Sequence, residues 1–222
     1  MGNTLNMKVV LDFLGGLNKH NDRTWFEAHR ADYERAQHEF EEFITQVIEK
    51  FGEVEDLSGV RAKDSIMRIY RDVRFSKDKS PYKTGFGASI GTGGRKSGKL
   101  PYHLHIQPGN HSMAAGGLYM PEPAQLNRFR AAIDKDTKRF KAIIAAPDFK
   151  KAFGALGGEM LKTAPQGYAK DHPEIDLLKH KQVTVVHPLS DEALVSSKVV
   201  QEVVGTFKAM KPFIDYLNEV SR

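Results

Sequence analysis

The sequence predicts an α+β protein in which a small, mostly antiparallel sheet packs against N-terminal and C-terminal helices. Apolar residues recur at helical spacing up to Phe51, and the period then changes to two in short stretches between residues 65 and 119. Helical spacing resumes after residue 121, and a last strand follows at residues 182–187. We expect one domain over residues 1–222, because that late strand needs a sheet to join. A weak sub-boundary near residue 121 is the alternative.

Two helices are predicted at the start of the chain. Residues 7–17 carry apolar side chains at helical spacing, and Asn21 or Asp22 can cap a second helix that runs to about Phe51. The stripe expected to be buried in the second helix is Phe26, Tyr33, Phe40, Phe43, Ile44, Val47 and Phe51. Trp25 lies in its first turn and is interpreted as a core anchor; a stacking platform for a base or sugar is the alternative.

Residues 65–75 alternate between two kinds of side chain and predict a first strand. One face would carry Met67, Ile69, Arg71, Val73 and Phe75, and the other Ile66, Arg68, Tyr70, Asp72 and Arg74. Further strands are predicted at residues 86–90, 102–106 and 113–119, and their short connections favour antiparallel pairing. In the strand at 102–106, His103 and His105 share the face opposite the apolar side chains.

The second helical half begins at residues 121–123, since proline is tolerated in a first helical turn. Apolar spacing predicts helices around residues 126–133, 140–144 and 149–156. Ser190 is expected to cap a final helical region that reaches Val220. Gly205 and Pro212 both disfavour an unbroken helix, so we expect this region in two pieces.

Composition excludes several classes of site and of protein. The chain has no cysteine, which excludes disulfides and thiol chemistry. No window approaches about eighteen consecutive apolar residues, so we expect no membrane span. The first residues also lack the pattern of a secretory signal. We therefore expect a cytoplasmic protein without a membrane partner.

Positive charge is concentrated in one part of the chain. The formal net charge is +5, but residues 61–99 contain eleven Lys and Arg against three Asp, a local balance of +8. Such a band favours an acidic partner: a phosphate, a nucleotide, nucleic acid or a carboxylate-rich ligand. The alternative is a solvated basic surface without a specific partner.

The candidate site lies in this band. Arg68 and Arg74 would share a strand face with Asp72 between them. A carboxylate in that position orients the planar guanidinium groups so that they can bind a phosphate or carboxylate. The residues predicted to bind an anionic small molecule are Arg68, Arg71, Asp72, Arg74, Lys79, Tyr82, Lys83, His103 and His105. If the protein is an enzyme, His103 or His105 would be its general base. The alternative is an internal network in which Asp72 and Asp78 neutralise the arginines.

The sequence also contains residues that are compatible with a metal site or a nucleotide-binding loop. His103, His105 and an oxygen of Asp72 are compatible with metal ligation, but a polar sheet face is the simpler interpretation, and we predict no metal site. Residues 91–99 are rich in glycine and lysine but lack the spacing of a nucleotide-binding loop, and no cofactor is indicated.

Nucleic acid is the second candidate partner. The aromatic residues Tyr70, Phe75, Tyr82 and Tyr102 are interleaved with Lys and Arg, as in proteins that bind single strands. The third alternative is a structural or partner-binding protein without a small-molecule site.

Residues 68–83, which read RIYRDVRFSKDKSPYK, resemble the signature of a family of conserved proteins, domain of unknown function 2461. The resemblance covers nearly the whole chain, and the other similar stretches are residues 18–26, 108–109, 116–121, 126–133, 161–168 and 171–173. The chain departs from the family at residues 20–24, where the family tends to be rich in asparagine, and this bears only on the helix cap. The resemblance implies a shared fold but supplies no substrate and no catalytic roles.

Overall fold

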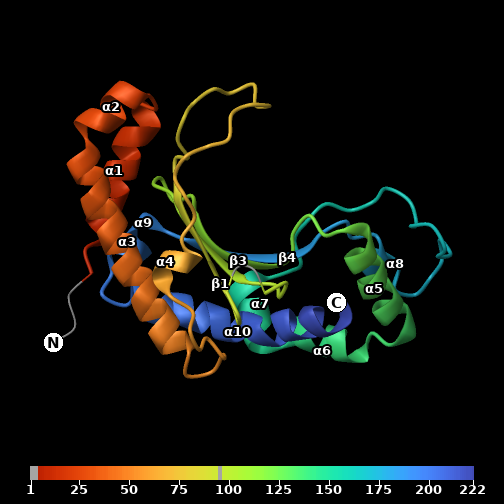
Figure 1. Ribbon diagram of the computed structural model, residues 1–222. Helices are drawn as coiled ribbons and strands as arrows, with labels where there is room; N and C mark the ends of the chain where they lie inside the picture. The colour runs from red at the N-terminus through yellow and green to blue at the C-terminus, as the bar shows by residue number, and fades with distance from the viewer. Residues whose placement is uncertain (1–4, 95–96) are drawn as a thin grey trace.

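The structure, a computed structural model, describes residues 5–94 and 97–222. Those residues form ten helices and one four-stranded antiparallel sheet. In Figure 1, helices α1 to α3 stand at one end of the sheet and helix α10 runs beneath it, while α5 and α8 lie at the other end. The predicted fold class, α+β with a small antiparallel sheet against N-terminal and C-terminal helices, is confirmed.

The sheet consists of β1 (Phe86–Ile90), β2 (Tyr102–Ile106), β3 (Ser112–Leu118) and β4 (Val183–Leu189), in that order. All neighbouring pairs are antiparallel, and His103 of β2 lies opposite Ser89 of β1 and Ala115 of β3. β4 pairs with β3 along its whole length, from Ser112 opposite Leu189 to Leu118 opposite Val183. The late strand therefore joins the same sheet, as the sequence predicts.

The two faces of the sheet differ in what covers them. Leu104 and its neighbours on one face are buried, and α10 (Val199–Val220) packs there so closely that a Cβ on Gly116 would lie 2.4 Å from Sδ of Met210. On the opposite face, His103 and His105 are half-buried and Val186 is exposed. The alternation predicted for β2 is confirmed.

The N-terminal helices are α1 (Met7–Lys19), α2 (Arg23–Ala28) and α3 (Arg30–Phe51). The single helix predicted up to Phe51 is therefore wrong, because it is interrupted at His29. The His29 ring stacks on Trp25 with centroids 4.0 Å apart, and its Nδ1 bonds the Trp25 carbonyl oxygen at 2.8 Å. Asp22 caps α2 by accepting a hydrogen bond from the backbone N–H of Trp25 (2.9 Å).

The C-terminal half adds α5 (Pro123–Lys135), α6 (Lys138–Ala145), α7 (Pro147–Phe153), α8 (Ile175–Leu178) and α9 (Asp191–Val195) before α10. Ser190 caps α9, as predicted. The final helical region is in two pieces, but α10 runs unbroken through Gly205 and Pro212, so the predicted cause of the break is wrong. Eleven buried residues hold α10 against the core, and this packing outweighs the two unfavourable residues.

The strand predicted at residues 65–75 is also wrong. Helix α4 (Ala62–Ser65) comes first, and residues 66–83, which we call the arm, then form only isolated bridges, Ile66 with Ala88 and Tyr70 with Tyr82. Tyr70 lies four positions after Ile66, but Ala88 lies six positions after Tyr82, so the register slips by two. Beyond the second bridge Pro81 has no N–H to continue the ladder. The arm projects above the sheet in Figure 1.

The buried side chains of both halves belong to one hydrophobic cluster, which includes Met7 of α1 and Leu217 of α10. One domain over residues 1–222 stays a prediction. Within the described part of the chain, no helix is both long and apolar enough to cross a bilayer.

Candidate functional site

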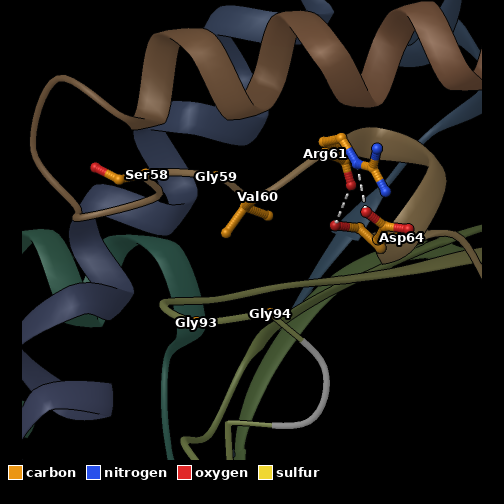
Figure 2. Close-up of a pocket in the computed structure, with 8 residues that line it drawn as sticks. Ser58, Gly59, Val60, Arg61, Asp64, Gly93 and Gly94 are labelled. Atoms are coloured by element: carbon orange, nitrogen blue, oxygen red, sulfur yellow. Dashed lines mark hydrogen bonds and ion pairs between the residues drawn. The ribbon is translucent and has the colours of Figure 1, made fainter.

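One cavity of about 620 Å³ lies between the loop that precedes α4 and the loop after β1 (Figure 2). It is lined by Ser58, Gly59, Val60, Arg61, Asp64, Ser65, Gly93 and Gly94. Among the described residues that line it, the charged side chains are Arg61 and Asp64, and they neutralise each other, since Arg61 Nε donates to Asp64 at 2.6 Å. None of the residues predicted to bind a ligand line it, so it is not the candidate site.

A second cavity, of about 470 Å³, lies at the base of the arm and does hold predicted residues. It is lined by Asn18, Asn21, Arg71, Asp78, Ser80, Tyr82, Lys83, Thr84, Gly85 and His105. These side chains come from three places in the chain: the end of α1 and its following turn, the arm with its link to β1, and β2. We call this cavity the arm-base pocket.

Arg71 is held in the arm-base pocket by several hydrogen bonds. Its Nη1 donates to the Asp78 carboxylate and to the Ser80 carbonyl oxygen (3.2 Å), and its Nη2 donates to Oγ of Ser76 (3.4 Å). Asp78 also accepts from the hydroxyl and backbone N–H of Ser80 (2.6 and 2.9 Å). These donors, Ser80 first and then Arg71, lower the pKa of Asp78 to about 2. Asp78 is thus a carboxylate at neutral pH and orients the guanidinium.

Asn21 joins the helical end of the pocket to the arm. Its amide donates to the Tyr82 carbonyl oxygen (2.9 Å) and accepts from the Tyr82 N–H (3.1 Å). The Tyr82 ring is buried and stacks on Phe26 with centroids 4.1 Å apart. Burial raises the pKa of Tyr82, so its phenol stays protonated. Tyr82 contributes to the wall of the pocket mainly by fixing the arm against the core.

Two histidines lie on the sheet face that leads out of the pocket. His105 lines the pocket, and its Nε2 donates to Oε1 of Gln107 (2.9 Å). The His103 ring lies 6.4 Å from it and nearly parallel. Burial, followed by the nearby His105 and Lys83, lowers the pKa of His103, which is therefore neutral at pH 7. Gly85 leaves room for His105, since a Cβ there would lie 2.7 Å from its ring.

The structure brings four of the nine predicted residues, Arg71, Tyr82, Lys83 and His105, into the pocket, with His103 beside them. The others lie outside its lining: Arg68, Asp72, Arg74 and Lys79 are exposed. Asp72 accepts from Arg74 Nε and Nη2 (2.9 and 2.7 Å), and Lys79 Nζ donates to the Val73 carbonyl oxygen (3.0 Å). The Arg74–Asp72 and Arg71–Asp78 pairs are those of the alternative ion-pair network.

Sequence reasoning missed Asn18 and Thr84 as pocket residues, and it considered Asn21 only as a helix cap. The contact between Asn21 and Tyr82 spans 61 residues, and no local pattern predicts it. The only signal was the similarity of residues 18–26 to the family. Among the described residues, no group of three or more His, Asp or Glu side chains is placed to hold a metal ion.

Comparison with known proteins adds one finding. No curated protein and no solved structure matches the chain. A family model does match, over residues 9–216, and its description is conserved hypothetical protein (DUF2461). Since that match covers nearly the whole length of the chain, the protein belongs to the DUF2461 family.

Proposed function

We propose that the arm-base pocket binds a small molecule through a phosphate or carboxylate group. The observation that supports this most is the convergence of two arm cations, Arg71 and Lys83, with His105 of β2 around a cavity of about 470 Å³. Arg71 has five N–H donors, and its hydrogen bonds to Asp78, Ser80 and Ser76 use three of them. A guanidinium already oriented by a carboxylate loses little entropy when it binds a planar or tetrahedral anion.

The rest of the pocket suits the same ligand. Asn18 and Thr84 supply an amide and a hydroxyl, which hydrogen-bond anionic oxygens without adding charge. A molecule held by its anionic group would extend toward His105 and the neutral imidazole of His103. If the protein is an enzyme, one of these two imidazoles would be its general base. A cytoplasmic location, predicted from the sequence, is part of the same proposal.

The test uses inorganic phosphate as the probe and follows binding by isothermal titration calorimetry. Lys83→Gln should lower the affinity for phosphate about tenfold, the loss expected for one charge-assisted hydrogen bond. Lys77→Gln removes an exposed lysine of the same basic band that lies outside the pocket, and it should leave the affinity within about twofold. Equal affinities for the two variants, or no binding by the native protein, would overturn the proposal.

Nucleic acid was the second candidate partner, and the described geometry supports it less. Of the four aromatic residues that suggested stacking, Tyr82 and Tyr102 are buried in the core, which leaves Tyr70 and Phe75. Backbone phosphates contacted by the whole basic band would make Lys77→Gln and Lys83→Gln equally harmful, with binding that weakens steeply as salt increases. The phosphate titration and a filter-binding assay at two salt concentrations separate the two candidates.

A further inference from the structure

The tip of the arm carries an aromatic side chain that has almost no intramolecular cover. Phe75 is 96% exposed, and the guanidinium of Arg74 lies 5.8 Å from its ring centroid. Lys77 and Lys79 are exposed on the same tip, and among the described residues neither forms an ion pair. The tip, residues 72–79, therefore presents an exposed ring beside two lysines, whereas its other charged residues, Asp72, Arg74 and Asp78, form ion pairs.

Several hydrogen bonds hold this tip in a defined shape. Arg74 binds Asp72 through two nitrogens, and Lys79 Nζ caps the Val73 carbonyl oxygen. The backbone N–H of Ser76 donates to the same carbonyl at 3.3 Å. A tip ordered in advance loses little entropy when it docks, so its exposed ring is suited to a binding contact.

A groove of complementary character lies elsewhere on the molecule. It has a volume of about 580 Å³ and runs between the C-terminal half of α3 and the junction of α9 with α10. Apolar residues line part of it, and Glu42 and Glu49 contribute carboxylates from two turns of α3 seven residues apart. Lys50 contributes one positive charge, so the net charge of the lining is −1 (two Glu, one Lys). The full lining is Leu5, Glu42, Thr45, Gln46, Glu49, Lys50, Leu194, Ser196, Ser197, Val199, Val200 and Gln201.

The tip and the groove of one molecule do not face each other. In Figure 1 the arm rises on the side of the sheet away from α10, whereas the groove includes the start of α10. A contact between them must therefore join two molecules. It would use different surfaces on each partner, so it can propagate into a ring or a chain of subunits.

We propose that the Phe75 tip of one molecule docks in the α3–α9–α10 groove of a second copy of this chain. Phe75 would enter the groove, and Lys77 and Lys79 would approach Glu42 and Glu49 at its edge. Charge complementarity supports this occupant, because the charges of the tip outside ion pairs are the lysines Lys77 and Lys79, and the lining of the groove has a net charge of −1 (two Glu, one Lys) on the same chain. This contact is independent of the arm-base pocket and of its ligand.

The first test is sedimentation velocity over a concentration series up to about 1 mM, where even weak association is detectable. The native protein should self-associate, and added salt should weaken the association. Phe75→Ser should lower the association constant at least about tenfold, as for the central residue of an interface. Tyr119→Ser is the control: it removes another aromatic side chain that is 72% exposed, and it should change the association constant less than twofold. A native protein that stays monomeric throughout, or equal effects of the two variants, would overturn the proposal.

The second test is a charge exchange. Lys77→Glu places a negative charge on the tip, and Glu49→Lys places a positive charge in the groove. Each variant alone should associate about tenfold more weakly than the native protein, because like charges then meet. An equimolar mixture should regain association, since the altered tip of one variant fits the altered groove of the other. A mixture that associates no better than either variant alone would show that tip and groove do not meet.

Discussion

Trp25 occupies space that only a glycine at position 16 leaves open. A Cβ on Gly16 would lie 2.7 Å from Cζ2 of Trp25, whereas a Cβ on Gly15 would meet nothing within 4 Å. The same indole lies 6.0 Å from the Phe13 ring and stacks on His29. Trp25 therefore works as a packing anchor, in agreement with the preferred interpretation of the sequence, and the adjacent glycines of α1 have different roles.

Gly16→Ala should destabilise the protein, and Gly15→Ala should stabilise it. The clash with Trp25 forces a shift that costs about 1–3 kcal/mol, which exceeds the gain of about 1 kcal/mol in helix propensity. Gly15→Ala keeps that gain without the clash. Urea unfolding of the two variants and the native protein measures both changes. If both variants move in the same direction, Trp25 does not depend on Gly16.

Among single residues, Phe75 is the one for which the sequence was most misleading. Alternation predicted it on the apolar face with Met67 and Ile69, and Ile69 is indeed buried. The alternation fails at Phe75 because the arm projects away from the sheet (Figure 1) and the Phe75 side chain is 96% exposed, so no core remains for that face to cover.

At the scale of elements, the arm depends on long-range contacts that the sequence does not display. Its residues read as a strand because side-chain alternation is local, but pairing is lost through the register slip and Pro81. The strands β1 to β4 were predictable because each pairs regularly with a neighbouring strand, so the strand that local alternation predicts does form. The end of α10 at Val220 was predictable, but its unbroken course through Gly205 and Pro212 was not. Tertiary packing stabilises the helix there, and local sequence does not reveal such packing.

Asn21 is expected to be the main attachment of the arm to the N-terminal helices. Asn21→Ala removes both hydrogen bonds to the Tyr82 backbone, which should cost about 1–3 kcal/mol because a half-buried N–H and carbonyl lose their partners. Hydrogen exchange should then accelerate in the arm, residues 66–83, more than in the sheet.

Asn18→Ala is the matched control for this change. Asn18 lines the same pocket but is exposed, so its removal should leave the exchange of the arm unchanged. Equal protection of the arm in Asn21→Ala and the native protein would mean that the stacking of Tyr82 on Phe26 alone holds it in place.

At the scale of the whole molecule, the fold class followed from the sequence and the pocket did not. Changes of period along the chain are local signals, and they identified the helical halves and the sheet between them. The pocket combines Asn18, Arg71 and His105, which three different elements supply. Arg71 lines the pocket and Arg68 and Arg74 do not, and this difference depends on tertiary contacts that the local sequence does not show.

Burial of two histidines should make the stability of the whole protein depend on pH. The pKa values of His103 and His180 are both lowered, chiefly by burial, so the folded state binds fewer protons than the unfolded state below pH about 6.5. Stability should then be full above that pH and fall as the pH decreases toward the folded pKa values. Asp78 affects stability at lower pH. Its folded pKa of about 2 lies below its unfolded value, so its contribution to the stability of the fold is lost only as the pH falls below about 4.

His103→Gln should reduce this dependence. Thermal or urea unfolding at pH 7.5 and pH 5.5 gives the difference in unfolding free energy, and that difference should be smaller in His103→Gln than in the native protein, because one buried imidazole no longer takes up a proton on unfolding. His38→Gln removes an exposed histidine of α3 and is the control. A native protein more stable at pH 5.5 than at pH 7.5 would contradict the sign of the effect. A difference that His103→Gln leaves unchanged would place the pH dependence in other groups.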